Sequence, residues 1–243
     1  MKKTINLFFL IILICNCKGQ EKAKEFRPIM NTQKNFKDSV NSNAKLLLTN
    51  EFYWDLENHN SPFSLNRVSN TFTDFIEWRK KNLKTNITDY FPEIGENELI
   101  FDRNKTDLET VKAFYEIHSN MQKEMFGMLG NLMDSITSQV NELTGKDRIT
   151  KKISQEEKNE ILERTANQMG ATALMEHDDE IITVGFAQFV TEGTIDKDMK
   201  VLTEKAIQRQ LLPYVLDQFE DIEFRKRREV EFKIMLEDLN KIK

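Results

Sequence analysis

The feature that most constrains the fold is a long run of apolar residues at helical spacing in the middle of the chain. Between residues 108 and 143 they recur every three or four positions, which places them on one face of a single helix. They are Leu108, Val111, Tyr115, His118, Met121, Met125, Met128, Leu129, Leu132, Ile136, Val140 and Leu143. Thr106 and Glu109 form a capping box before the run, and Gly145 follows its end. The sequence therefore predicts one unusually long helix.

The centre of this helix, MQKEMFGMLGNLM at 121–133, is rich in methionine. A methionine stripe can form an adaptable binding groove, but we expect a packed core, with His118 packed on the same side. Gly127 and Gly130 each lower helix stability by about 1 kcal/mol relative to alanine. Their presence therefore predicts the close approach of another helix, or a kink.

A second helix is expected to begin at the capping box of Ser154 and Glu157 and to run toward Met175. The polar run HDDE at 177–180 is expected to interrupt it. The apolar run IITVGFAQFV at 181–190 fits either a strand or a buried helix, and we favour a helix because its neighbours are helical.

The rest of the chain also favours helices. Only 8 Gly and 4 Pro occur among 243 residues, which is sparse punctuation for a protein made of short strands. Gly193 and Asp196 predict a loop, and a last helical tract is expected over 198–242. Pro213 should kink this tract, because proline removes a backbone hydrogen bond and clashes with the preceding turn.

Both tryptophans lie in an aromatic-rich segment nearer the N-terminus, residues 51–82. The preceding residues, 36–50, are expected to form one helix. Thr71 and Asp74 fit a capping box that begins another helix, and this helix should carry an apolar face. That face consists of Phe72, Phe75, Ile76 and Leu83.

Two interpretations of the aromatic segment stay open. The favoured one is a core built on Phe52, Tyr53, Trp54 and Trp78, because aromatic side chains bury large areas. The alternative is a pocket for a ligand or partner. Its tentative contacts are Trp54, Asp55, Glu57, His59 and Trp78.

The same segment resembles a protein family. The order F-Y-W at 52–54, S-P-F at 61–63 and W-R-K at 78–80 is similar to that of the uncharacterised YfeS-like bacterial proteins, over roughly residues 51–82. The sequence departs from them at 64–71, where SLNRVSNT replaces a turn rich in Gly and Asp. The family has no established activity, so the resemblance implies no function. The missing acids also speak against a metal or polar site at this turn.

The N-terminus has the pattern of an export signal. Lys2 and Lys3 precede an apolar run, Leu7–Ile14, that is too short to cross a bilayer, which requires about 20 residues. No A-x-A-like cleavage site follows. Instead Cys15 and Cys17 end the run, and residues 1–20 resemble a lipoprotein signal of the kind found in Bacteroidetes.

Cys17 fits the lipid-bearing position better than Cys15, because compact Asn16 precedes it, whereas bulky Ile14 precedes Cys15. The resemblance implies a diacylglyceryl thioether on Cys17 and usually an N-acyl chain such as palmitate. Two or more fatty chains anchor a protein stably. The alternatives are a simple cleaved signal and an uncleaved hydrophobic tail.

Residues 17–35 are expected to form a flexible tether that holds the folded part off the membrane. Lys18 stands at the second mature position, where it favours the outer membrane over the inner one by similarity to lipoprotein sorting in other bacteria. The formal net charge is −5 and becomes −7 when Lys2 and Lys3 are removed, which argues against a nucleic-acid partner. No cysteine follows Cys17, so we expect no disulfide.

Known metal and catalytic patterns are mostly missing. The segment DRNKTDLE at 102–109 resembles an EF-hand loop only in part, because Asp107 occupies the glycine position and Ala113 the glutamate position. In the HDDE run, consecutive helical residues point in different directions, so we expect a solvated helix end and no metal. No H-x-x-x-H, E-x-x-H, G-x-S-x-G, P-loop or G-x-G-x-x-G pattern occurs. No cofactor is therefore expected.

The basic run FRKRRE at 224–229 has two interpretations. It could contact anionic head groups or an acidic partner, but the acidic residues around it favour a helix surface covered by ion pairs. We favour the surface interpretation.

Together these patterns predict a mainly α protein, with a small aromatic-rich N-terminal module packed on a bundle of long helices. The expected divisions are a signal peptide at 1–16, a tether at 17–35, the module at 36–101 and the bundle at 102–243. The expected function is a lipid-anchored envelope protein with a binding, scaffold or protective role, reaching the membrane through Cys17 and contacting a protein partner. The alternative is an envelope enzyme with a site between the module and the bundle, with Asp55, Glu57 and His59 as candidates.

Overall fold

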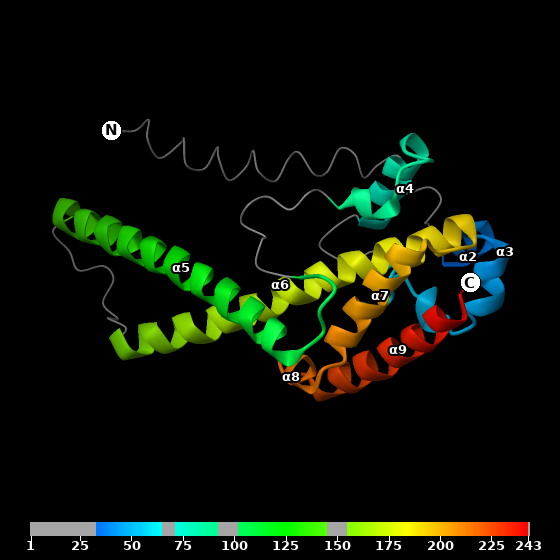
Figure 1. The fold of residues 1–243 in the computed structure, drawn as a ribbon. Helices are drawn as coiled ribbons and strands as arrows, with labels where there is room; N and C mark the ends of the chain where they lie inside the picture. Colours follow the sequence, from blue (N-terminus) through cyan, green and yellow to red (C-terminus); the bar gives the residue numbers. More distant parts are fainter. Residues whose placement is uncertain (1–32, 65–70, 92–101, 145–154, 243) are drawn as a thin grey trace. The chain divides into compact units, whose positions relative to one another are not determined.

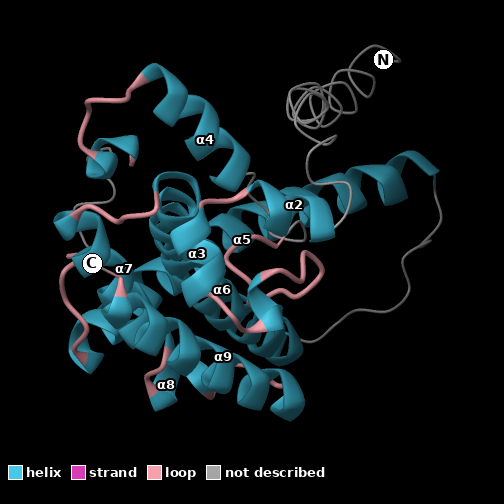
Figure 2. Cartoon of the chain, turned by 90° about the vertical axis from the view of Figure 1, so that its right-hand side faces the viewer, coloured by secondary structure: helices cyan, strands magenta, loops and turns pink. Residues whose placement is uncertain are grey.

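Helices make up the regular structure of the protein, as the sequence predicts. The computed structural model describes residues 33–64, 71–91, 102–144 and 155–242, so the predicted signal peptide, Cys17 and most of the tether lie outside the described residues. The described residues contain helices and no strand (Figures 1 and 2). The helices are α2 (Gln33–Ser39), α3 (Ser42–Leu47), η2 (Glu51–Tyr53), α4 (Thr71–Lys81), η3 (Ile87–Tyr90), α5 (Leu108–Thr144), α6 (Gln155–Glu192), α7 (Lys197–Gln210), α8 (Pro213–Leu216) and α9 (Ile222–Lys241).

The chain divides into two compact units that do not follow each other in sequence. Unit 1 consists of Met1–Tyr90, Thr183–Ile195 and Lys241–Lys243, and unit 2 consists of Phe91–Ile182 and Asp196–Asn240. Helix α6 therefore supplies residues to both units. In the described residues no helix combines the length and the apolarity that crossing a bilayer requires.

The described part of unit 1 begins with two short helices where the sequence predicts one helix over 36–50. The chain breaks at Asn41, whose side chain accepts a hydrogen bond from the backbone N–H of Asn43 at 2.9 Å and so caps α3. The backbone N–H of Asn41 donates to the carbonyl of Val190 at 2.7 Å. The single-helix prediction is wrong, because an asparagine cap and a tertiary hydrogen bond compete with helix continuation.

The core of unit 1 is aromatic, which confirms the favoured interpretation for Phe52, Tyr53 and Trp54, all of which are buried. The Trp54 ring lies 6.0 Å from Phe36 and 6.1 Å from Phe63, centroid to centroid. Aromatic rings at these separations add favourable contacts to the area that they bury.

Helix α4 confirms the helix predicted from Thr71, but its apolar face ends earlier than expected. Phe75 is fully buried, whereas Leu83 lies two residues beyond the helix and is 72% exposed. The prediction for Leu83 is wrong because α4 ends at Lys81.

The apolar half of α6 completes the core of unit 1. All residues of 181–190 are buried, and those from 183 onward belong to this unit, which confirms the helix favoured for this run. The Tyr53 ring lies 5.7 Å from that of Phe186. Gly193 ends the helix with φ of +80° and donates its N–H to the carbonyl of Phe189, which confirms the predicted loop.

In unit 2, α5 confirms the long predicted helix and ends at Thr144, one residue before Gly145. Its cap lies one residue later than predicted. The Asp107 carboxylate accepts from the backbone N–H of Thr110 at 2.9 Å and from its hydroxyl, so Asp107 replaces Thr106 as the N-cap. These hydrogen bonds lower the pKa of Asp107. A carboxylate caps as well as a hydroxyl and also favours the positive end of the helix dipole.

Helices α5 and α6 approach each other closely at Gly170, and not at Gly127 as the sequence suggests. A Cβ atom on Gly170 would lie 3.0 Å from the backbone oxygen of Tyr115. At Gly127 an added Cβ would meet nothing within 4 Å. Gly130 lies within α5, and its surroundings are outside what the structure describes.

The core prediction for the methionine stripe is wrong at each of its described positions. Met121 is 53% exposed, Met125 41% and Met128 67%. The packed part of α5 lies nearer its start, where Val111, Phe114 and Tyr115 form a core with Leu174 and Val215. His118 is half-buried, with its ring 4.2 Å from that of Phe114. Spacing alone marks a helix face but does not show how far along that face a neighbour reaches.

Two further predictions about helix ends are wrong. The HDDE run does not interrupt α6, which is continuous through it because both aspartates are buried against cations. Ser154, the predicted cap of this helix, lies outside the described residues. The last tract is broken rather than kinked, because Leu212 is extended and Pro213 opens a new helix, α8.

The basic run at the start of α9 is partly a solvated surface, as predicted. Arg225 pairs with Asp217 at 2.8 Å and Lys226 with Glu223 at 3.1 Å, near the surface. Arg228 contradicts the surface interpretation, because it is only 1% exposed. A cation can be buried there because Asp179 supplies a partner charge.

Candidate ligand-binding cavity

The two tryptophans among the tentative contacts of the aromatic segment pack within the described part of unit 1. Trp54 is fully buried and donates its Nε1–H to the carbonyl of Leu48 at 3.0 Å. Trp78 is half-buried, with its ring 6.1 Å from Phe75 and 5.5 Å from Tyr90. Both tryptophans therefore act in packing within this unit.

The polar candidates of the same segment lie in turns at its surface. The Asp55 carboxylate accepts a hydrogen bond from the backbone N–H of Glu57 at 3.0 Å, which is the geometry of an Asx turn. The side chains of Glu57 and His59 are exposed. Within unit 1, Asp55 therefore stabilises a turn, and Glu57 and His59 lie at the surface of this segment.

The two aspartates of the HDDE run form a buried polar network that the sequence interpretation missed. Asp178 and Arg209 are both fully buried, and the Arg209 Nε–H donates to Asp178 Oδ1 at 3.0 Å. Gln210 donates to the second carboxylate oxygen at 2.8 Å, and Arg209 Nη1 donates to the backbone carbonyls of Arg103 and Lys105. Asp178 is thus paired and hydrogen-bonded, which is what a buried charge requires.

Gln210 connects this pair to a second one. Its side-chain oxygen accepts from Arg228 at 2.9 Å, and Arg228 also donates to Asp179 at 3.1 Å. The Arg228 guanidinium lies over the Phe232 ring, 4.1 Å from its centroid. The network ties α6, α7 and α9 together inside unit 2 and has a structural role.

Burial moves the pKa values of two neighbours on α6 in opposite directions. Desolvation raises the pKa of Asp178 to about 6, although Arg209 and Gln210 act to lower it. Desolvation lowers the pKa of His177 to about 3, and the nearby Arg103 and Arg209 act in the same direction. His177 is therefore neutral at physiological pH.

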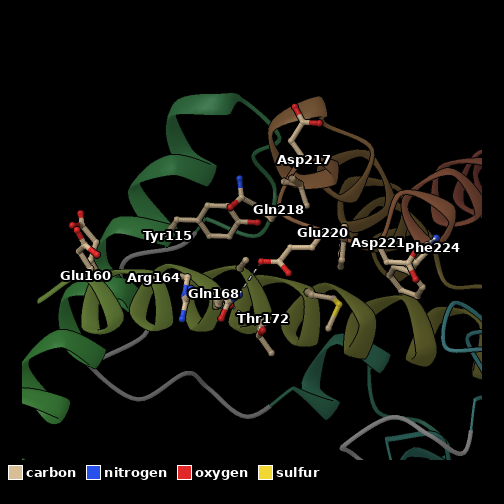
Figure 3. A pocket seen from close by; sticks show the side chains of 15 residues that line it. Tyr115, Glu160, Arg164, Gln168, Thr172, Asp217, Gln218, Glu220, Asp221 and Phe224 are labelled. Carbon is tan, nitrogen blue, oxygen red and sulfur yellow. Dashed lines mark hydrogen bonds between the residues drawn. The ribbon is translucent and has the colours of Figure 1, made fainter. Parts of the chain in front are cut away.

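A cavity of about 890 Å³ lies in unit 2, against one face of α6 (Figure 3). Tyr115 of α5, Gln168 and Thr172 of α6, and the residues between α8 and α9 line it. Its apolar lining includes Ala171, Met175, Val215, Phe219 and Phe224. The volume is in the range of small-molecule sites.

Tyr115 gives this cavity a polar group that the fold itself does not use. The residue is 7% exposed, and its buried hydroxyl has no hydrogen-bond partner in the described structure. Figure 3 shows the hydroxyl end directed toward the side of the cavity where Gln218 and Glu220 lie. Burial raises the pKa of Tyr115, so the phenol stays neutral and can donate or accept a hydrogen bond.

Acidic side chains dominate the polar lining. The carboxylates are Glu160, Glu163, Asp217, Glu220 and Asp221, and the cation is Arg164. In the described residues no three His, Cys, Asp or Glu side chains gather closely enough to hold a metal ion. No sequence pattern predicted this site, because its acids come from two distant stretches of an acidic chain.

Comparisons with protein-family models, with curated proteins and with solved structures found no match for this chain. The candidate site therefore rests on the geometry of unit 2 alone.

Proposed function

We propose that this protein is a lipid-anchored binding protein of the bacterial cell envelope, with its ligand site in the cavity of unit 2. The observation that supports lipid anchoring is the position of Cys17, directly after a short apolar run and a compact residue. The cavity supports the binding role, because it is large enough for a small molecule and contains a buried hydroxyl without a partner.

The anchor is tested by metabolic labelling with an alkyne analogue of palmitate in a bacterium that processes lipoproteins. Wild type and Cys15→Ala should carry the label, and Cys17→Ala should lose it, because only Cys17 is expected to receive lipid. Label on Cys17→Ala at the wild-type level would contradict the proposal. Sedimentation of the envelope on a density gradient then tests for the outer membrane, which Lys18 favours.

Exposed methionines favour a protein partner as a second ligand. Met121, Met125 and Met128 lie on α5 and are at least 41% exposed, and methionine-rich surfaces adapt to different partners. A photo-crosslinking residue at position 125 should trap one discrete partner in intact cells, whereas the same residue at exposed Lys233 on α9 should not. Equal crosslinked products from both positions would mean that the exposed methionines do not bind a specific partner. The same crosslinking experiment tests a scaffold or a protective role, because each of them also requires a protein partner.

In unit 1 the enzyme alternative receives no support from its candidate residues. Glu57 and His59 are exposed, and Asp55 is used by a turn.

A further inference from the structure

The acids of the unit 2 cavity stand on two facing walls. Glu160 and Glu163 belong to α6, and Glu220 lies in the segment that joins α8 to α9. Figure 3 shows Glu160 at one end of the cavity and Glu220 near its middle, with its carboxylate directed toward Gln168. The negative charges are therefore spread along the cavity and not collected at one point.

Some of these carboxylates are weakly engaged by the protein itself. Glu220 accepts one long hydrogen bond, from Gln168 at 3.4 Å, and Glu163 lies 3.9 Å from Lys123. Asp217 and Asp221 are already used, the first by Arg225 and the second by the backbone N–H groups that begin α9. Glu160, which has no partner in the described structure, and the weakly engaged Glu163 and Glu220 are therefore the acids best able to pair with a cation that enters.

The distribution favours an extended organic cation over a metal ion. A metal ion needs several oxygen ligands within bonding distance of one point, and the described residues provide no such cluster. A chain with separated ammonium groups needs separated carboxylates instead, and its methylenes need apolar surface. Ala171, Met175 and Val215 supply apolar surface in the lining of the same cavity.

The Tyr115 hydroxyl adds a hydrogen-bonding group at the buried side of the cavity. A neutral phenol accepts a hydrogen bond from an ammonium group through its oxygen lone pairs. Such a bond would satisfy the buried oxygen that the protein leaves without a partner.

We propose that the cavity of unit 2 binds an aliphatic polyamine, with its ammonium groups at Glu163 and Glu220, an N–H donated to the Tyr115 hydroxyl, and its methylenes on the apolar part of the lining. This inference rests on the proposed binding function and names its ligand class. A volume of about 890 Å³ is in the range of small-molecule sites, so a free polyamine fits the cavity.

The test is isothermal titration of the full-length protein in detergent with spermidine at low salt. We expect one spermidine per chain, and binding that weakens as salt is raised, because exposed charges are screened. Hexylamine should bind more weakly, since it offers a single ammonium group. Calcium ions should not displace spermidine.

Three variants locate the site. Glu220→Gln should weaken spermidine binding about tenfold, the loss expected for a charge-assisted contact. Tyr115→Phe should weaken it about fivefold, while leaving thermal stability close to wild type because the hydroxyl has no partner in the protein. Glu237→Gln removes the same charge from an exposed position of α9 that does not line the cavity, and it should change the affinity less than about twofold.

Several results would overturn the inference. They are no heat with spermidine, an equal effect of Glu237→Gln and Glu220→Gln, or an unchanged affinity in both Glu220→Gln and Tyr115→Phe. Binding of a lysine-rich peptide without binding of spermidine would also overturn it and would assign the acidic walls to a protein partner. None of these results affects palmitate labelling at Cys17, so failure of the ligand class and failure of the anchor are distinguishable.

Discussion

The two ends of helix α6 are buried by opposite means. Toward the C-terminus, residues 183–190 lie in the aromatic core of unit 1, where the Phe186 ring meets Tyr53. One turn earlier, in unit 2, Asp178 and Asp179 are buried against two arginines. Apolar packing tolerates a change of shape at moderate loss, whereas a buried charge without its partner is strongly unfavourable. Helix α6 therefore contributes to one core where substitutions cause a moderate loss of stability and to another where the loss of one charge causes a large one.

The largest expected effect is in the charged core. Arg209→Met should lower the free energy of unfolding by about 3–5 kcal/mol, because it leaves Asp178 buried without its cation. Asp178→Leu together with Arg209→Met should recover part of the loss, since no uncompensated charge remains. Lys233→Met, which breaks an exposed pair with Glu229, serves as the control and should lose less than about 1 kcal/mol. Chemical denaturation measures all three, and equal losses in Arg209→Met and Lys233→Met would mean that the buried pair contributes no more to stability than an exposed one.

A smaller effect is expected in the aromatic core. Trp54→Phe keeps a ring but loses volume and the hydrogen bond to Leu48, so we expect a loss of about 2 kcal/mol. Trp78→Phe should lower the free energy of unfolding by less, because the Trp78 ring is only half-buried. If Trp78→Phe is the more damaging of the two by chemical denaturation, Trp54 is not the centre of this core.

The pH dependence of the free energy of unfolding should reveal the lowered pKa of His177. Between pH 6.5 and about 3 the unfolded chain binds a proton at this histidine and the folded chain does not, so the free energy of unfolding falls as pH falls. Asp178 acts in the opposite direction below about pH 6, because the folded chain holds its proton more tightly. From pH 7.5 to 5.5, wild type should lose about 1 kcal/mol more than His177→Gln. Parallel pH profiles for the two proteins would contradict the pKa of this histidine.

The smallest effects come from two glycines within unit 2, and they should have opposite signs. Gly127→Ala should stabilise the protein by up to about 1 kcal/mol, because its surroundings are open and alanine favours the helix. Gly170→Ala should destabilise it by about 1 kcal/mol, because the new methyl would press on the Tyr115 carbonyl. Melting temperatures compare the two variants, and the same sign in both would disprove the close approach at Gly170.

The sequence predicts the helices well but not the contacts between them. The 3.6-residue period of α5 and the apolar run at 181–190 were sufficient for the helices, because local spacing determines them. The exposure of Met125 and the close approach at Gly170 were not predictable, since both depend on where a neighbouring helix ends or crosses. The same limit applies to the break at Asn41, which depends on a hydrogen bond to Val190.

The candidate site in unit 2 was even harder to predict from the sequence than the helix contacts. Glu163 and Glu220 lie far apart in an acidic chain, and nothing in their local sequence marks them as neighbours of one cavity. Tyr115 carries the helical period of a core residue, so its hydroxyl gave no separate signal. A polar site assembled from distant stretches depends on tertiary packing, which spacing does not encode.

The most direct test of the two-core account is hydrogen exchange along α6 in wild type and Arg209→Lys, a variant that keeps the charge but loses the planar fork. We expect faster exchange at amides of 171–182 and in α7, while amides of 183–190 keep protection close to wild type. Equal acceleration over both halves of α6 would contradict it, because one core would then depend on the charges as much as the other.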